Sequence, residues 1–211
     1  MSSARNPEIA VFDYGAGNQR SVLSAFKFLG FNVKAISTPR EISQAEKIVV
    51  PGVASFGDCA KEIEKSGAAT ALRDFIDEGK PYLGMCLGLQ ILFESSDESP
   101  GETGLGVFKG GVKGLRTSPE LKVPHMGWNR VSLSGGGLFT GVSDQSWFYF
   151  AHSFYVEPED SSIIAARVSY GSEFTAAVEK DNVFACQFHP EKSSDAGLEV
   201  LRNFAGFQPS P

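Results

Sequence analysis

The sequence predicts a doubly wound α/β fold, and three observations support this prediction. Short apolar runs alternate with segments of helical periodicity through the first half, glycines follow several of the helical segments, and the second half changes to strands joined by turns. Alternating strands and helices build a parallel sheet with helices on both faces. We therefore expect a three-layer fold with a central mixed, mostly parallel sheet and an additional small antiparallel β region in the second half.

The first half is predicted to repeat strand and helix four times. The predicted strands are the apolar runs 9–14, 31–37, 47–50 and 81–85. Each is followed by a predicted helix. The first helix covers 22–29, the second begins at the capping-box sequence Thr38-Pro39-Arg40-Glu41, and the others cover 58–78 and 87–94.

The second half is predicted to be mainly antiparallel. Apolar and β-branched runs predict strands at 129–133, 146–156, 163–169, 174–179 and 183–188, and Asp181-Asn182 predicts a tight hairpin turn. A final helix is expected over 195–204. Because no long linker separates the halves, we expect one domain over 1–211, with a flexible extension at 1–7 and a flexible tail at 208–211.

The composition argues against several classes of protein. Nineteen basic and 25 acidic residues give a formal net charge of -6 without a basic stripe, so nucleic acid is not an expected partner. No run approaches the ~20 apolar residues of a membrane span, and the N-terminal stretch lacks the apolar core of a secretory signal. Three cysteines without a CxxC pair are typical of a reducing compartment, so we expect a cytoplasmic protein.

A cysteine stands between two glycines where a strand is predicted to turn into a helix. The segment Gly84-Met85-Cys86-Leu87-Gly88 is the thiol form of a nucleophile elbow, in which glycines allow a tight turn to project the nucleophile. A helix N-terminus lowers the pKa of a thiol and offers backbone amides to an oxyanion, in this chain the amide of Leu87. The elbow therefore predicts that Cys86 is a nucleophile.

A nucleophilic cysteine needs a base, and the chain has three histidines. His189 ends an apolar strand, and Glu191 follows two residues later, so both side chains can face the same side. A carboxylate beside an imidazole fixes its tautomer and stabilises its charged form. Cys86, His189 and Glu191 are therefore the predicted catalytic triad.

The other cysteines and histidines have plain structural interpretations. Buried cysteine commonly acts as a small apolar residue, which is our interpretation of Cys59 and Cys186. His125 and His152 lack a carboxylate at the spacing that favours His189, and they are left open between a structural and a functional role.

The order of the cysteine elbow and the His-Pro-Glu sequence resembles the class I, triad-type glutamine amidotransferases over nearly the whole chain. More narrowly, the chain is similar to the family of glutaminase subunits of imidazole glycerol phosphate synthase. The motifs that carry the narrower resemblance are Asp13-Tyr14-Gly15-Ala16-Gly17-Asn18, Pro51-Gly52-Val53, Pro124-His125-Met126-Gly127-Trp128-Asn129 and His189-Pro190-Glu191-Lys192-Ser193-Ser194. The resemblance implies a flavodoxin-like amidotransferase fold.

The resemblance also implies the reaction and its residues. Glutamine would be hydrolysed to glutamate and ammonia, without a cofactor or metal. The ammonia would pass to a (β/α)8-barrel cyclase that makes imidazole glycerol phosphate and an aminoimidazole carboxamide ribonucleotide. By motif, the glutamine site would contain Gly52, Gln90, Glu98, Ser153 and Phe154, the oxyanion site Gly52, Val53 and Leu87, and the face toward the cyclase Asn18, Trp128, Asn129 and Lys192.

One position departs from the family pattern. The family usually has glycine after Pro-Gly-Val, whereas this chain has Ala54, which tolerates positive φ less readily. If activation turns the Gly52-Val53 peptide toward the oxyanion, Ala54 could change the energy that this turn requires. We expect the free subunit to be nearly inactive and the liganded partner to activate it.

Four other functions match parts of this pattern. Gly15-Ala16-Gly17 suggests dinucleotide binding, but Arg20 replaces the third glycine of that fingerprint. A catalytically silent scaffold would not need all three triad residues. A thiol hydrolase with another substrate would suit the elbow equally well, but Gln90 and Glu98 favour glutamine. A related glutaminase that supplies a different synthase stays open, because the partner decides it.

Overall fold

The computed structural model describes residues 8–15, 19–116 and 121–208. The first half contains, in chain order, β1 (Ile9–Phe12), α1 (Gln19–Phe28), β2 (Val33–Ile36), α2 (Pro39–Gln44), β3 (Lys47–Gly52), α3 (Phe56–Lys65), α4 (Ala68–Asp77), β4 (Tyr82–Cys86), α5 (Leu87–Gln90) and β5 (Phe93–Ser96). The second half contains the following elements, in which η denotes a short 3-10 helix: β6 (Phe108–Gly114), β7 (His125–Leu133), η1 (Gly137–Phe139), β8 (Trp147–His152), β9 (Phe154–Pro158), η2 (Ser161–Ile163), β10 (Ile164–Tyr170), β11 (Ser172–Lys180), β12 (Val183–Cys186), η3 (Pro190–Lys192) and α6 (Ser194–Gly206).

A nine-stranded sheet with the order β2-β1-β3-β4-β12-β11-β10-β7-β8 forms the centre of the molecule. Its first five strands are parallel, in the doubly wound order of flavodoxin-like folds, and the strands from β12 onward pair antiparallel. The predicted mixed sheet is therefore confirmed. The prediction placed only a small antiparallel region beside a mostly parallel sheet. In the structure, the antiparallel strands continue the central sheet and make as many strand pairings as the parallel strands do. The remaining strands form a separate small sheet, β5-β6-β9.

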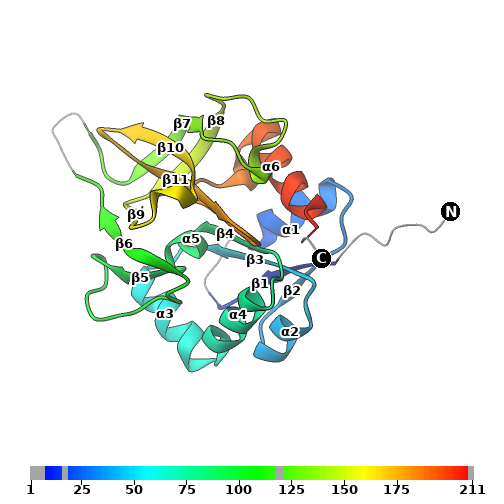
Figure 1. The fold of residues 1–211 in the computed structure, drawn as a ribbon. Helices are drawn as coiled ribbons and strands as arrows, with labels where there is room; N and C mark the ends of the chain where they lie inside the picture. Colours follow the sequence, from blue (N-terminus) through cyan, green and yellow to red (C-terminus); the bar gives the residue numbers. More distant parts are fainter. Residues whose placement is uncertain (1–7, 16–18, 117–120, 209–211) are drawn as a thin grey trace.

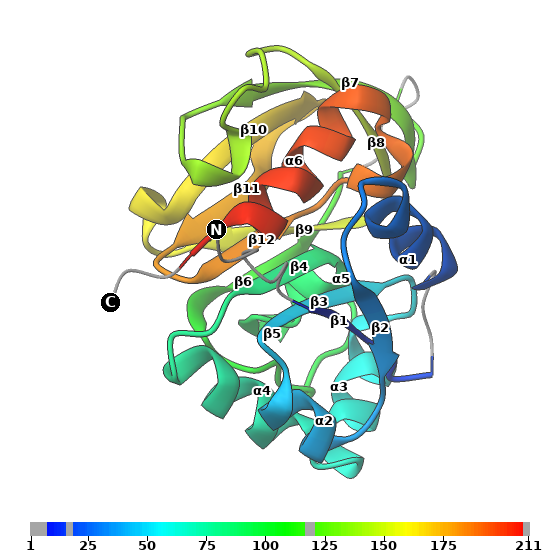
Figure 2. The ribbon, with the colours of Figure 1, turned by 90° about the vertical axis from the view of Figure 1, so that its right-hand side faces the viewer.

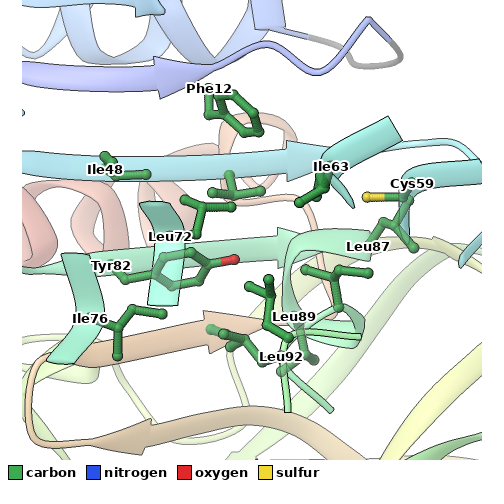
Figure 3. Close-up of a cluster of buried hydrophobic side chains, with 14 of the residues drawn as sticks. Phe12, Ile48, Cys59, Ile63, Leu72, Ile76, Tyr82, Leu87, Leu89 and Leu92 are labelled. Atoms are coloured by element: carbon green, nitrogen blue, oxygen red, sulfur yellow. The ribbon is translucent and has the colours of Figure 1, made fainter. Parts of the chain in front are cut away.

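Helices cover both faces of the parallel strands, as predicted. Figures 1 and 2 show α2, α3 and α4 on one face and α1 and α6 on the other. Successive residues of each strand point to opposite faces. In β3, Val50 packs into the core under α3 and α4, whereas Val49 packs into the core under α1 and α6. Figure 3 shows the first of these cores, where Tyr82 and Leu87 lie among side chains of α3 and α4.

Several predicted elements differ from the structure in their bounds, and three of these differences change the number or the course of the elements. The predicted helix over 58–78 is two helices, because Gly67 adopts a left-handed φ of 75° between α3 and α4. The helix after Cys86 ends at Gln90 instead of residue 94, since the chain then turns to pair β5 with β6. The predicted strand over 146–156 breaks at Ser153, where the chain leaves the large sheet and enters the small one.

Two local predictions are confirmed in detail. Thr38 and Glu41 form a reciprocal capping box at the start of α2. Asp181, at a φ of 52°, forms with Asn182 the two-residue hairpin loop between Lys180 and Val183.

Among the described helices, none has the length and apolar character needed to cross a membrane. The predicted flexible extension at 1–7 and residues 209–211 of the predicted tail at 208–211 lie outside the described residues, whereas Gln208 is described and exposed.

Candidate active site

Cys86 lies at the end of β4 in a backbone conformation that non-glycine residues seldom adopt. Its φ and ψ are 53° and -105°, so the chain reverses sharply before α5. The neighbouring glycines permit the close packing that this turn requires. A Cβ atom on Gly84 would collide with the carbonyl of Gly88, and one on Gly88 would collide with the carbonyl of Val50. The elbow geometry is therefore held by packing between β3, β4 and α5.

His189 and Glu191 follow β12 and lie beside Cys86. His189 Nδ1 is 3.1 Å from Glu191 Oε1, and the Cys86 side chain lies close enough to the His189 ring to raise its pKa. The Glu191 side chain is only 1% exposed, so its interaction with the imidazole is little screened by water. The structure thus brings together the three side chains of the predicted triad.

The protonation of His189 is set by these two neighbours. Burial alone lowers the pKa of His189, but hydrogen bonds with Cys86 and Glu191 and the negative charges of both outweigh burial and raise its pKa to about 10. The arrangement therefore favours an imidazolium beside the sulfur. An imidazolium stabilises a thiolate, which is the nucleophilic form of cysteine.

A cavity of about 360 Å³ opens above the sulfur. Most of the predicted substrate-binding residues line it, together with residues from β7 and β8. The lining residues are Val53, Ala54, Cys86, Leu87, Gln90, Glu98, Pro124, Met126, Ala151, His152, Ser153, Phe154, His189 and Lys192. The cavity thus lies at the carboxyl ends of the parallel strands, where α/β sheets commonly bind ligands.

Gln90 and Glu98 reach this cavity from different elements. Gln90 Nε2 donates to the Phe154 carbonyl at 3.0 Å and to Gln187 Oε1 at 3.1 Å. Glu98 Oε2 accepts from the backbone amide of Phe56, the first residue of α3, at 2.7 Å. Gln90 therefore serves as a connector within the protein, while Glu98, which follows β5, binds the start of α3 and lines the cavity.

The predicted oxyanion residues occupy the rim and the rear of the cavity. Val53 is 57% exposed and lines the cavity with Leu87, whereas Gly52 is buried behind them. A Cβ atom on Gly52 would collide with the Tyr14 hydroxyl and with Leu87 Cβ, so glycine is required there for packing. Ala54 is not among the four described non-glycine residues with positive φ, and its conformation does not require glycine.

Two residues near Cys86 had no predicted role in the site. Gln187 was not among the predicted site residues, and the role of His152 was left open. Gln187 is fully buried and donates from Nε2 to Cys86 Sγ at 3.5 Å. His152 Nδ1 lies 2.8 Å from the Phe154 carbonyl, and its Nε2 lies 3.0 Å from His125 Nδ1. The sequence contained a signal for Gln187, because this polar residue interrupts an apolar strand two positions before His189.

The two remaining histidines form a buried neutral pair. Burial lowers the pKa of His125 to about 4 and that of His152 to about 3, the latter also through the nearby His125 and His189. His125 Nε2 lies 3.4 Å from Asn129 Nδ2, and the His125 ring stacks on Tyr170 with centroids 4.0 Å apart. The pair thus links the cavity wall to β7 and β10.

The residues predicted to face a partner separate into two groups. Trp128 is 47% exposed beside Tyr149, and Lys192 Nζ lies 5.7 Å from the Tyr149 ring centroid at the cavity mouth. Asn129 points to the other side of β7, where its amide donates to the Ser169 carbonyl at 2.9 Å. Neighbouring residues of a strand face opposite sides, so Trp128 and Asn129 do not share one surface. Asn18 lies outside the described residues.

Comparison with known proteins matches this geometry to a family. The family described as glutamine amidotransferase class-I matches residues 10–206. The chain belongs to this family. Two solved structures share the fold: PurLQS from Thermotoga maritima, with a TM-score of 0.74 and 24% identity over 94% of this chain and 97% of that one, and a glutamine amidotransferase, with a TM-score of 0.73 and 21% identity over 94% and 99%. The predicted family and fold class are confirmed.

More similar relatives carry the name that the narrower resemblance predicts. The amidotransferase is 45% identical to imidazole glycerol phosphate synthase subunit HisH of Geobacter metallireducens, over 93% of this chain and 97% of that protein. It is 47% identical to the protein of the same name from Methanothermobacter thermautotrophicus, over 93% and 96%. The match therefore spans nearly the full length of both relatives.

Proposed function

We propose that this amidotransferase is the glutaminase subunit of an imidazole glycerol phosphate synthase. One observation carries the proposal. Cys86, in its strained turn, lines the same cavity as His189, and His189 is hydrogen-bonded to Glu191. Relatives that share 45% and 47% of their residues with this chain and are named as this subunit support the choice of synthase. We extend the proposal to a single domain in a cytoplasmic protein, whose three cysteines are all free.

In the proposed reaction, the Cys86 thiolate attacks the side-chain amide carbon of glutamine. A C–S bond forms, the C–N bond breaks, and His189 gives its proton to the departing ammonia. Water then attacks the thioester while His189 takes one of its protons, the C–S bond breaks, and glutamate leaves with the thiolate restored. Glu191 holds the imidazole and stabilises its charge in both steps.

The cavity supplies groups suited to both ends of glutamine. The Glu98 carboxylate would attract the α-ammonium group, and the chain at Ser153 and Phe154 would hold the backbone end of the substrate. The amide of Leu87, with those of the Gly52-Val53 segment, would stabilise the oxyanion of each tetrahedral intermediate. Gln90 would act by fixing the Phe154 carbonyl, to which it donates a hydrogen bond.

The partner would be a (β/α)8-barrel cyclase that receives the ammonia. The surface formed by Met126, Trp128, Tyr149 and Lys192 suits this role, because it surrounds the cavity mouth and exposes large apolar side chains. Apolar and aromatic residues beside a charged group are typical anchors of a protein interface. Asn129 would support this surface from behind instead of touching the partner.

The test combines the purified chain with a barrel cyclase and measures product formed from glutamine or from added ammonium. We expect glutamine-dependent product with the wild type, and ammonium-dependent product alone with Cys86→Ala. Trp128→Ala should weaken complex formation roughly tenfold or more. Glutamine-dependent turnover by Cys86→Ala would overturn the nucleophile assignment, and activity only with a synthase of another pathway would favour the related glutaminase instead. The chain alone should turn over glutamine slowly.

A further inference from the structure

Gln187 is a fully buried polar residue in contact with the nucleophile. It follows β12, whose four residues are apolar or cysteine and are all buried. A buried side-chain amide destabilises the fold unless it is hydrogen-bonded. Gln187 is bonded at both ends: its Oε1 accepts from Gln90 Nε2 at 3.1 Å, and its Nε2 donates to Cys86 Sγ at 3.5 Å.

The backbone decides which end of this amide faces the sulfur. The Phe154 carbonyl can only accept hydrogen bonds, so the Gln90 amide turns its NH2 group toward it, at 3.0 Å. The same NH2 group then donates to Gln187, which must present its oxygen to Gln90 and its nitrogen to Cys86. Reversing the Gln187 amide would place two NH2 groups face to face and an oxygen against the sulfur.

We propose that Gln187 is a further catalytic residue, which stabilises the Cys86 thiolate by an N–H···S hydrogen bond whose direction is set by Gln90 and the Phe154 carbonyl. The inference rests on the proposed function. A donor to sulfur favours the charged thiolate over the thiol. It also favours the return of charge to sulfur when the thioester C–S bond breaks, so the amide assists both the formation of the nucleophile and the release of glutamate.

His189 lies beside the sulfur and is supported by Glu191, and the Tyr14 hydroxyl and the Cys186 thiol also lie near Cys86. Glu98, His152 and Lys192 line the same cavity. These groups remain in place when Gln187 is replaced. A change in the pH dependence of Cys86 reactivity would therefore report the loss of the amide donor.

The test measures alkylation of Cys86 by iodoacetamide against pH in the free protein, with Cys86→Ala as the blank for the other two cysteines. Gln187→Met keeps the size and removes the donor, and Gln187→Glu replaces the donor with oxygen. We expect the midpoint to move up by about one pH unit in Gln187→Met and further in Gln187→Glu, with alkylation at a pH well below the wild-type midpoint slowed roughly tenfold. In the complex, kcat should fall while KM for glutamine stays within about twofold.

A matched control lies at the other end of the same strand. The Asn182 amide donates to the carbonyls of Ile76 and Lys80, at the opposite end of the paired strands β12 and β4 from the sulfur. Asn182→Leu should lower stability but leave the alkylation midpoint unchanged. An unchanged midpoint in both folded Gln187 variants would overturn the proposal.

A measurement on the wild type covers the case in which both variants fail to fold. The side-chain amide resonance of Gln187 should shift with the same pH midpoint as alkylation, and a resonance that stays fixed would overturn the proposal. Because alkylation and resonance need neither glutamine nor a partner, they test Gln187 even if the assigned synthase is wrong.

Discussion

The parallel and antiparallel halves of the central sheet differ in burial and in what they contribute to the site. Every residue of β1, β3, β4 and β12 is buried, since helices cover both faces. In β8, buried residues alternate with half-buried or exposed ones, and in β7 only His125 and Val131 are buried. The reacting groups therefore come from the enclosed half, whereas one cavity wall and the exposed mouth come from the open half.

This division separates two requirements. A nucleophile must be held in one conformation, and close packing on both faces provides that rigidity. A surface that receives a partner must stay accessible, and a sheet with one open face provides that exposure. β12 joins the halves, and Gln187 and His189, which follow it, lie where the two meet.

The largest expected effect comes from overpacking the enclosed half. Gly88→Ala would place a methyl group against the Val50 carbonyl, so β3 and α5 must separate. We expect a loss of about 3 kcal/mol in the free energy of unfolding and loss of glutaminase activity. Urea denaturation measures the free energy of unfolding, and an assay of glutamate release measures the glutaminase activity. Gly206→Ala is the control: its methyl group meets no atom within 4 Å, and it should change stability by less than about 1 kcal/mol. Similar values for both variants would contradict the rigid-elbow account.

A smaller effect is expected from a substitution at Glu191, which lies where the parallel and antiparallel halves of the sheet meet. Glu191→Gln keeps a hydrogen-bond acceptor for His189 but removes the charge, so kcat should fall roughly 100-fold. The folded-state pKa of His189, about 10, lies above its ordinary value of 6.5. Its stabilisation is thus fully present below pH 6.5 and is lost as the pH rises toward 10. The stability difference between wild type and variant should narrow over that range. A constant difference would show that the charge does not act through His189.

The smallest effect is expected in the open half. His125→Phe keeps the ring that stacks on Tyr170 but removes the hydrogen bond to His152, which should lower stability by about 1 kcal/mol at about pH 8. The pKa values of His125 and His152 in the folded state, about 4 and 3, lie below 6.5. The unfolded chain therefore binds protons first, and stability falls as the pH drops from 6.5 toward 4.

Because His125→Phe removes one of the two histidines, its free energy of unfolding should fall less than that of the wild type as the pH drops. Chemical denaturation at about pH 8 and about pH 5 measures it. Tyr170→Phe is the control, since it removes the hydroxyl that donates to the Lys122 carbonyl and leaves both histidines. If His125→Phe lost as much stability at about pH 5 as the wild type, the histidine pair would not be the source of the pH dependence.

Much of the parallel half could be predicted from local sequence. Each strand and helix there is a short continuous segment with its own apolar period, and the capping box and glycines mark several boundaries. The predicted helix over 58–78 was wrong because the pattern on both sides of Gly67 is helical, and only the φ of that glycine separates α3 from α4. The antiparallel half was harder, because non-local pairing decides where its strands end.

The amino-acid sequence alone was enough to specify the amidotransferase family, the alternation of strands and helices, and the candidate nucleophile with its histidine and glutamate. These features depend on spacings of a few residues, which the chain displays directly. Three-dimensional packing was needed to establish that the strand over 146–156 breaks at Ser153 and that Gln187 presents its nitrogen to Cys86. Each of these depends on hydrogen bonds or strand pairings with distant residues, so no local spacing could specify them.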